Sequence, residues 1–123
     1  MITLTLVYGR SSLQREEAIA SRLNKSLKNV VIAEGLAHGS TALAKLTEQD
    51  SIALIRIAPG CLCCIGNLTM QVTLNRVLRQ GPQAIYLSLS SSEHLSGIRE
   101  FLQNDQYRNL LCLTEDINSE LPV

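Results

Sequence analysis

The alternation of short apolar runs with helix-like segments constrains the fold of this 123-residue chain most strongly. The run Val30 to Ala33 is apolar throughout, which is typical of a strand covered on both faces. The strand-like segments are 2–8, 30–33, 51–58, 84–89 and 110–114, and the helix-like ones are 11–27, 41–48, 67–80 and 90–102. Strands separated by helices pair in parallel. The sequence predicts one α/β domain over residues 1–123, a parallel sheet with helices on both faces.

Caps and apolar spacing define the predicted helices. Two capping boxes are indicated, Ser11 with Gln14 and Ser90 with Glu93. Apolar spacing assigns an inner face to the first helix, Leu13, Ile19, Ala20, Leu23 and Leu27, and to the last, Leu95, Ile98 and Leu102. The helix that Asn67 would cap repeats apolar residues at Met70, Leu74, Val77 and Leu78.

Composition and charge exclude several classes of function. Lys plus Arg equals Asp plus Glu at 11 each, so no positive excess would hold a phosphate backbone. The chain has no Trp and one Phe, too few rings for stacking on nucleic-acid bases. No apolar run has membrane-spanning length, and the N-terminus has no basic segment or cleavage site of a signal peptide. We expect a cytoplasmic protein with reduced cysteines that binds neither nucleic acid nor membranes.

Three of the four cysteines lie within one short run, Gly60-Cys61-Leu62-Cys63-Cys64. Three thiolates converging on one point suit a soft or borderline ion such as zinc. A tetrahedral ion would need one more ligand, for which the candidates are Glu34, His38, His94, water or a group of a partner. An exchangeable fourth position would favour metal transfer or sensing over a closed structural site.

Other interpretations of these residues stay open. The clustered cysteines could be small buried hydrophobes, or thiols with a redox role. Glu34 follows a strand at the expected carboxyl edge of the sheet, where sites of α/β proteins form, whereas His38 and His94 occupy ordinary surface contexts. Cys112, between leucines in the last strand, is predicted to be a buried core residue. No Ser/His/Asp arrangement is evident around the serines at 88–92.

With strand, loop and helix in this order, the chain resembles the CobW-type family of P-loop GTPases and metallochaperones. The resemblance rests on Gly60-Cys61-Leu62-Cys63-Cys64, on Asn67-Leu68 and Leu74-Asn75-Arg76-Val77-Leu78 after it, and on Val31-Ile32-Ala33-Glu34-Gly35. It implies a P-loop-NTPase-like fold corresponding to the N-terminal half of a GTPase domain. It also implies that Cys61, Cys63 and Cys64 bind a metal, zinc above all.

The nucleotide-binding motifs of that family depart from their usual form. In G-x-x-x-x-G-K-[ST] counted from Gly9, Gln14 stands at the second Gly, Arg15 at the Lys and Glu16 at the Ser/Thr. The segment 88–91 lacks the acid and the glycine of the family's Glu-Thr-x-Gly, and the chain ends at Val123, before any Asn-Lys-x-Asp motif. We therefore expect a truncated relative with a degenerate P-loop, not an enzyme, for which GTP is an unlikely ligand. Arg10, Ser11, Ser12 and Arg15 could hold a simple anion at a helix N-terminus, but plain helix capping is favoured.

The sequence thus predicts a metal-binding protein that handles or senses zinc or a similar transition metal. The alternatives are a partner-binding or regulatory scaffold with incidental cysteines, and a divergent GTPase. The resemblance covers only the front half of a GTPase domain, so an uncovered strand edge or helix face is expected to form a homodimer. The second chain could supply the fourth metal ligand, and a further protein partner could receive the metal.

Overall fold

A computed structural model describes residues 1–123 except 36–41, 48–50, 58–67, 91, 94 and 121–123. Strands and helices alternate along the chain until the last two strands. The elements are β1 (Ile2–Tyr8), α1 (Ser12–Arg22), β2 (Asn29–Glu34), α2 (Ala42–Leu46), β3 (Ile52–Ile57), α3 (Leu68–Arg79), β4 (Ala84–Leu89), α4 (Leu95–Leu102), β5 (Leu111–Leu113) and β6 (Ile117–Asn118).

The strands form one parallel sheet in the order β3-β2-β4-β1-β5. Both β5 and β6 pair with the same edge of β1. β5 pairs with the beginning of β1, and the short β6 pairs with its end, at Val7 and Tyr8. The parallel sheet confirms the prediction from the sequence. β6 was not predicted, because two residues are too few to show a strand pattern.

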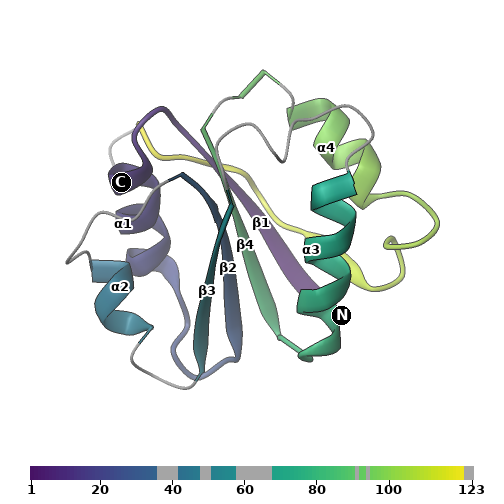
Figure 1. Cartoon of the computed structure of the whole chain (residues 1–123), viewed down its shortest axis with the longest axis horizontal. Helices are drawn as coiled ribbons and strands as arrows, with labels where there is room; N and C mark the ends of the chain where they lie inside the picture. The colour runs from purple at the N-terminus through teal and green to yellow at the C-terminus, as the bar shows by residue number, and fades with distance from the viewer. Residues whose placement is uncertain (36–41, 48–50, 58–67, 91, 94, 121–123) are drawn as a thin grey trace.

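Helices cover both faces of the sheet, with α1 and α2 on one side and α3 and α4 on the other (Figure 1). The face under α3 and α4 buries the larger apolar cluster, which includes Leu6, Ile32, Leu74, Ile85 and Ile98. The opposite face buries a smaller one: Val7, Ala18, Ile19, Val31, Ala33, Leu43 and Ile117. The prediction of an α/β fold with helices on both faces is confirmed, and the fold is compatible with a P-loop-NTPase-like arrangement.

The predicted inner face of α1 is partly wrong. Leu13 is 40% exposed, and the buried residues of the helix are Arg15, Glu16, Ala18 and Ile19. The helix also ends at Arg22 and not near Leu27, because the carbonyl and amide oxygens of Asn24 accept hydrogen bonds from the next residues and form a turn. Two charged side chains therefore point to the interior where apolar spacing had placed a leucine.

The predicted apolar faces of α3 and α4 are confirmed. Met70, Leu74 and Val77 are buried, as are Ile98 and Leu102. The cap predicted at Asn67 lies outside the described residues. The capping box predicted at Ser90 is wrong, since α4 begins at Leu95 and Ser90 donates its hydroxyl hydrogen to Glu34 instead.

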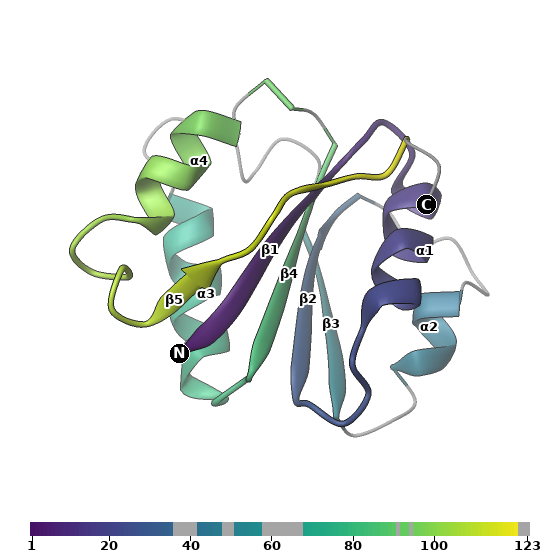
Figure 2. The same ribbon diagram turned by 180° about the vertical axis from the view of Figure 1, so that it is seen from behind.

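The prediction that Cys112 belongs to the core is also wrong. Its side chain is exposed and its thiol is free. Cys112 pairs in register with Thr3 on β5, a strand at the edge of the sheet, and neither α1 nor α2 covers that part of the face (Figure 2). Successive residues of a strand point to opposite faces of the sheet, so Cys112 and the leucines beside it face opposite sides. On an edge strand one of these faces can remain uncovered, and apolar neighbours in the sequence then do not predict burial.

At one point of the sheet, two neighbouring strands are followed by helices on opposite faces. β1 and β4 are adjacent, but β1 continues into α1 on one face and β4 leads to α4 on the other (Figures 1 and 2). Open α/β sheets bind ligands at the carboxyl ends of such strands. Within the described ranges, no helix is long and apolar enough to cross a membrane.

Candidate functional site at the carboxyl edge of the sheet

Among the described residues, Arg15 has the largest fully buried side chain, and it bonds to the carboxyl ends of the strands. Its Nε donates to Ser88 Oγ at 2.7 Å, its Nη1 to the Gly9 carbonyl at 2.5 Å, and its Nη2 to the Glu34 carbonyl at 2.6 Å. These acceptors lie on or directly after β4, β1 and β2. The guanidinium group therefore ties the ends of three strands together.

The charge of Arg15 is balanced inside the protein. Burial lowers the pKa of its guanidinium, and the carboxylates of Glu34 and Glu16 oppose this by raising it. An arginine keeps its proton under such conditions. Arg15 is thus a buried cation stabilised by two carbonyls, a hydroxyl and two nearby carboxylates.

Glu34, one of the predicted site residues, is buried at the end of β2. Its Oε1 accepts hydrogen bonds from the Ser90 amide, at 2.8 Å, and from the Ser90 hydroxyl. The Glu34 carboxylate therefore holds Ser90, the first residue after β4, in place. Glu34 also lies opposite Ile57 in the β2–β3 register, at the last described residue before the segment that contains the three cysteines.

Glu16, the residue after Arg15, forms a salt bridge with Arg56. Its carboxylate accepts two hydrogen bonds from Arg56 on β3, at 2.9 and 3.1 Å. The Glu16 side chain is 1% exposed and that of Arg56 25% exposed. This bidentate pair joins α1 to the outer strand β3.

The connection from β1 to α1 consists of Gly9, Arg10 and Ser11. Ser11 Oγ accepts a hydrogen bond from the Gln14 amide at 3.2 Å, so the predicted N-cap is confirmed. Gly9 has φ +154°, and a Cβ there would lie 2.0 Å from Ser119 Oγ. Arg15 stands at the lysine position of the P-loop motif and lies within the first turn of α1. All three of its guanidinium nitrogens donate hydrogen bonds to protein atoms.

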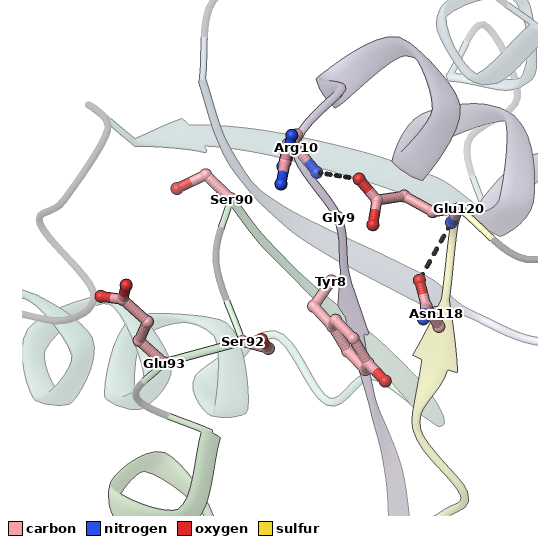
Figure 3. A pocket seen from close by; sticks show the side chains of 8 residues that line it. All are labelled: Tyr8, Gly9, Arg10, Ser90, Ser92, Glu93, Asn118 and Glu120. Atoms are coloured by element: carbon pink, nitrogen blue, oxygen red, sulfur yellow. Dashed lines mark hydrogen bonds between the residues drawn. The ribbon is translucent and has the colours of Figure 1, made fainter.

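An open pocket of about 330 Å³ lies beside this network, between the ends of β1, β4 and β6 (Figure 3). It contains two carboxylates, one guanidinium group and several hydroxyl or amide groups. The lining residues are Tyr8, Gly9, Arg10, Ser90, Ser92, Glu93, Asn118 and Glu120. The pocket lies at the point where the chain leaves β1 and β4 toward opposite faces.

The structure describes only one of the residues predicted to bind a metal. Cys61, Cys63 and Cys64 lie outside the described residues, as do His38 and His94, and Glu34 is the one candidate ligand whose surroundings are described. No three His, Cys, Asp or Glu side chains within the described part of the chain are grouped to hold a metal ion. The predicted three-cysteine site thus remains a prediction.

Sequence reasoning missed the buried hydrogen bonds of Arg15 and the salt bridge between Glu16 and Arg56. A usable signal existed, because Arg15 and Glu16 precede Ile19 by four and three residues, the spacing of one helix face. A second signal was the polar residues Ser88 and Arg56 within apolar strands. Neither signal identifies the partner, because the partners come from separate strands.

The comparisons with known proteins gave one partial match. The chain is 36% identical over 74 residues to Zinc chaperone YeiR of Escherichia coli (strain K12), a CobW-family protein. The match covers 54% of this chain and 23% of that relative, so the chain corresponds to less than a quarter of the relative's length. No family model and no solved structure matches the chain. The partial similarity agrees with the CobW-type resemblance over about half of the sequence.

Proposed function

We propose that this protein binds zinc or a similar transition metal through Cys61, Cys63 and Cys64 and handles or senses that metal. The observation that carries the proposal is the cysteine run at 61–64, and the partial similarity to a zinc chaperone supports it. Three thiolates and one exchangeable ligand would let a partner or a second chain take the ion. Glu34 and His38 are the proposed candidates for the fourth position. The bonds of Glu34 to Ser90 favour a supporting role for that carboxylate.

We further propose that the protein neither hydrolyses GTP nor binds it with useful affinity. Phosphate loops bind anions through free backbone N–H groups and a lysine that is free to reach the phosphates. Here the residue at the lysine position is buried and bonded to Gly9, Ser88 and Glu34, and Glu16 is paired with Arg56. Calorimetric titration with GTP and Mg²⁺ tests this proposal, and micromolar binding would contradict it.

The metal proposal is tested by elemental analysis of untagged protein purified without chelators. Wild type is expected to carry about one zinc ion per chain, and the Cys61→Ser/Cys63→Ser/Cys64→Ser variant to carry a background amount. Binding should weaken as the pH falls, because protons compete for the thiolates. Equal metal content in the two proteins would refute the proposal.

Cys112→Ser is the matched control for this experiment. The Cys112 thiol is exposed, so it can oxidise or bind metal adventitiously. Removing it should leave the metal content unchanged. A loss of zinc on Cys112→Ser would place the site on β5 and contradict the proposal.

Four further features stay predictions: the homodimer, the protein partner for metal transfer, the cytoplasmic location and the single domain over 1–123. Light scattering with and without chelator tests self-association. A dimer lost only with chelator supports a metal shared between chains, and a monomer under both conditions contradicts the homodimer.

A further inference from the structure

The strand β3 forms one edge of the sheet, and within the described part of the chain it pairs with β2 alone (Figures 1 and 2). The opposite edge consists of two short pieces, β5 with three residues and β6 with two. Short edge strands are a common protection against pairing with another chain. β3 is a regular strand of six residues, so it is the edge that can accept a further strand.

The backbone groups of β3 alternate between the two sides of the strand. The carbonyl of Ser51 accepts a hydrogen bond from an amide of β2, and the carbonyl of Ile57 accepts one from the amide that follows β2. Because the direction alternates from residue to residue, Ile52 and Leu54 direct their amide and carbonyl groups away from β2. Leu54, in the middle of the strand, therefore presents a donor and an acceptor at the sheet edge.

The side chains of β3 lack the features that usually protect an edge strand. Its sequence, IALIRI, contains no proline, glycine or lysine. Its one charged residue, Arg56, is bound at 2.9 Å by Glu16 of the same chain. Residues 53–55 are apolar and only half-buried, whereas every residue of the neighbouring β2 is buried. Pairing with a further strand would therefore cover apolar surface as well as backbone groups.

A second copy of this chain fits the edge. Two β3 strands can pair in antiparallel direction about a two-fold axis, the commonest symmetry of protein dimers. With the axis beside Leu54, each Leu54 lies opposite that of the other copy, and Ala53 lies opposite Ile55. Arg56 then lies opposite Ile52, whereas an axis beside Arg56 would place two guanidinium groups opposite each other. The net charge of the chain is zero, so the two copies as a whole do not repel each other.

We propose that two copies of this chain form a symmetric dimer by antiparallel pairing of β3 at Leu54, so that the two sheets become one. This inference rests on the predicted homodimer and names its interface. The amide of each Leu54 donates to the Leu54 carbonyl of the other copy. The pairing uses backbone groups and apolar side chains, so it needs no metal. The segments that contain the cysteines follow Ile57, and the pairing places the two Ile57 residues about 20 Å apart, at opposite ends of the interface.

Sedimentation velocity of the full chain over a range of micromolar concentrations is the experiment. Wild type is expected to show the mass of two chains with and without chelator. Leu54→Lys places two ammonium groups opposite each other and removes an apolar pair, so it should raise the dissociation constant at least about tenfold. Leu110→Lys is the matched control, because Leu110 is an exposed leucine directly before β5 at the opposite edge. It should leave the mass unchanged.

A charge exchange tests the register of the pairing. Leu54→Glu should weaken the dimer as Leu54→Lys does. An equimolar mixture of the two variants should regain the dimer, because unlike charges then lie opposite each other. Recovery in the mixture also shows that both variants are folded.

Two measurements on wild type need no substitution. The Leu54 amide should exchange its hydrogen with solvent at least about tenfold more slowly in the dimer than in the dilute monomer, because only the dimer gives it an acceptor. Metal content of the same samples separates this inference from the proposed metal site. A dimer without zinc would support the interface and contradict the metal proposal alone.

Four results would overturn the inference. One is a wild-type monomer at every concentration, which would leave the edge to a strand of another protein. Another is a dimer that dissociates when chelator is added. The third is a dimer that Leu110→Lys weakens and Leu54→Lys does not. The fourth is rapid exchange of the Leu54 amide within a dimer.

Discussion

Arg10 and Arg15 lie close together in the sequence at the start of α1, yet they belong to two different regions. The Arg15 side chain is in a sealed network with 1% exposure, bonded to three strand ends, whereas Arg10 is exposed and lines an open pocket. The two regions share Gly9 and Ser90, which the network holds and which the pocket presents. The network joins the ends of three strands, whereas the charged side chains that line the pocket are exposed to solvent.

The comparison also shows what a buried charge requires. A guanidinium group taken out of water is tolerated only where its donors find acceptors and its charge finds a counter-charge. Arg15 has both, from Gly9, Ser88 and Glu34 and from nearby carboxylates. Losing such a group leaves its partners buried without compensation. The expected cost of mutation in the network is therefore much larger than in the pocket.

The largest effect is expected for Arg15→Ala, which should lower the free energy of unfolding by about 3–5 kcal/mol. The variant leaves a cavity and removes the cation that faces Glu34 and Glu16. Arg10→Ala is the matched control and should change stability by less than about 0.5 kcal/mol. Urea unfolding of the three proteins measures both values. Equal losses in the free energy of unfolding for Arg15→Ala and Arg10→Ala would contradict the distinction between the buried network and the open pocket.

The next effect is expected for Glu16→Ala, at about 3 kcal/mol, because Arg56 then loses a bidentate partner at a largely buried site. The double variant Glu16→Ala/Arg56→Ala should cost less than the sum of the single variants. Urea unfolding gives the coupling energy. A coupling near zero would show that the sealed network does not extend to β3.

A smaller effect, about 2 kcal/mol, is expected for Gly9→Ala at the border of the two regions. The backbone there has φ +154°, and the new Cβ would displace the Ser119 hydroxyl from the Tyr8 carbonyl. Gly97→Ala, with nothing within 4 Å of the new Cβ in helix α4, should stabilise the protein by up to about 1 kcal/mol. Thermal unfolding compares the two. Destabilisation by Gly97→Ala as large as that by Gly9→Ala would remove the special role of Gly9.

The smallest effect is expected for Tyr107→Phe, at about 1 kcal/mol near neutral pH. Its hydroxyl donates to Asn75 Oδ1 at 2.9 Å, a neutral hydrogen bond that serves as a reference for the charged ones. Burial raises the pKa of Tyr107 above its value in the unfolded chain, so the folded state holds the proton more tightly. That contribution is complete below about pH 10 and is lost as the pH rises through the pKa of the folded state. The difference in the free energy of unfolding between wild type and Tyr107→Phe should therefore shrink above pH 10. Urea unfolding at a series of pH values measures this difference, and a difference that grows with pH would contradict the prediction.

Where local patterns decide a structure, the sequence predicted it well. The strand at 84–89 was predicted with its observed ends, because this mainly apolar segment lies between turn residues. The Ser11 cap and the buried Met70, Leu74 and Val77 followed from hydrogen-bond geometry and helix periodicity within a few residues. The parallel sheet followed from the alternation of these elements. The cysteine run is equally a property of the sequence alone, and its role awaits the metal analysis.

The tertiary structure decided the rest, because it depends on which distant segments meet. Cys112 is exposed since β5 is an edge strand, and Ser90 bonds to Glu34 since β2 and β4 are neighbours in the sheet. Leu13 lost its inner position to Arg15 and Glu16 because those side chains find acceptors and a counter-charge on strands that the local pattern cannot identify. Apolar periodicity scores burial by residue type, whereas a charge becomes buried when packing brings it partners.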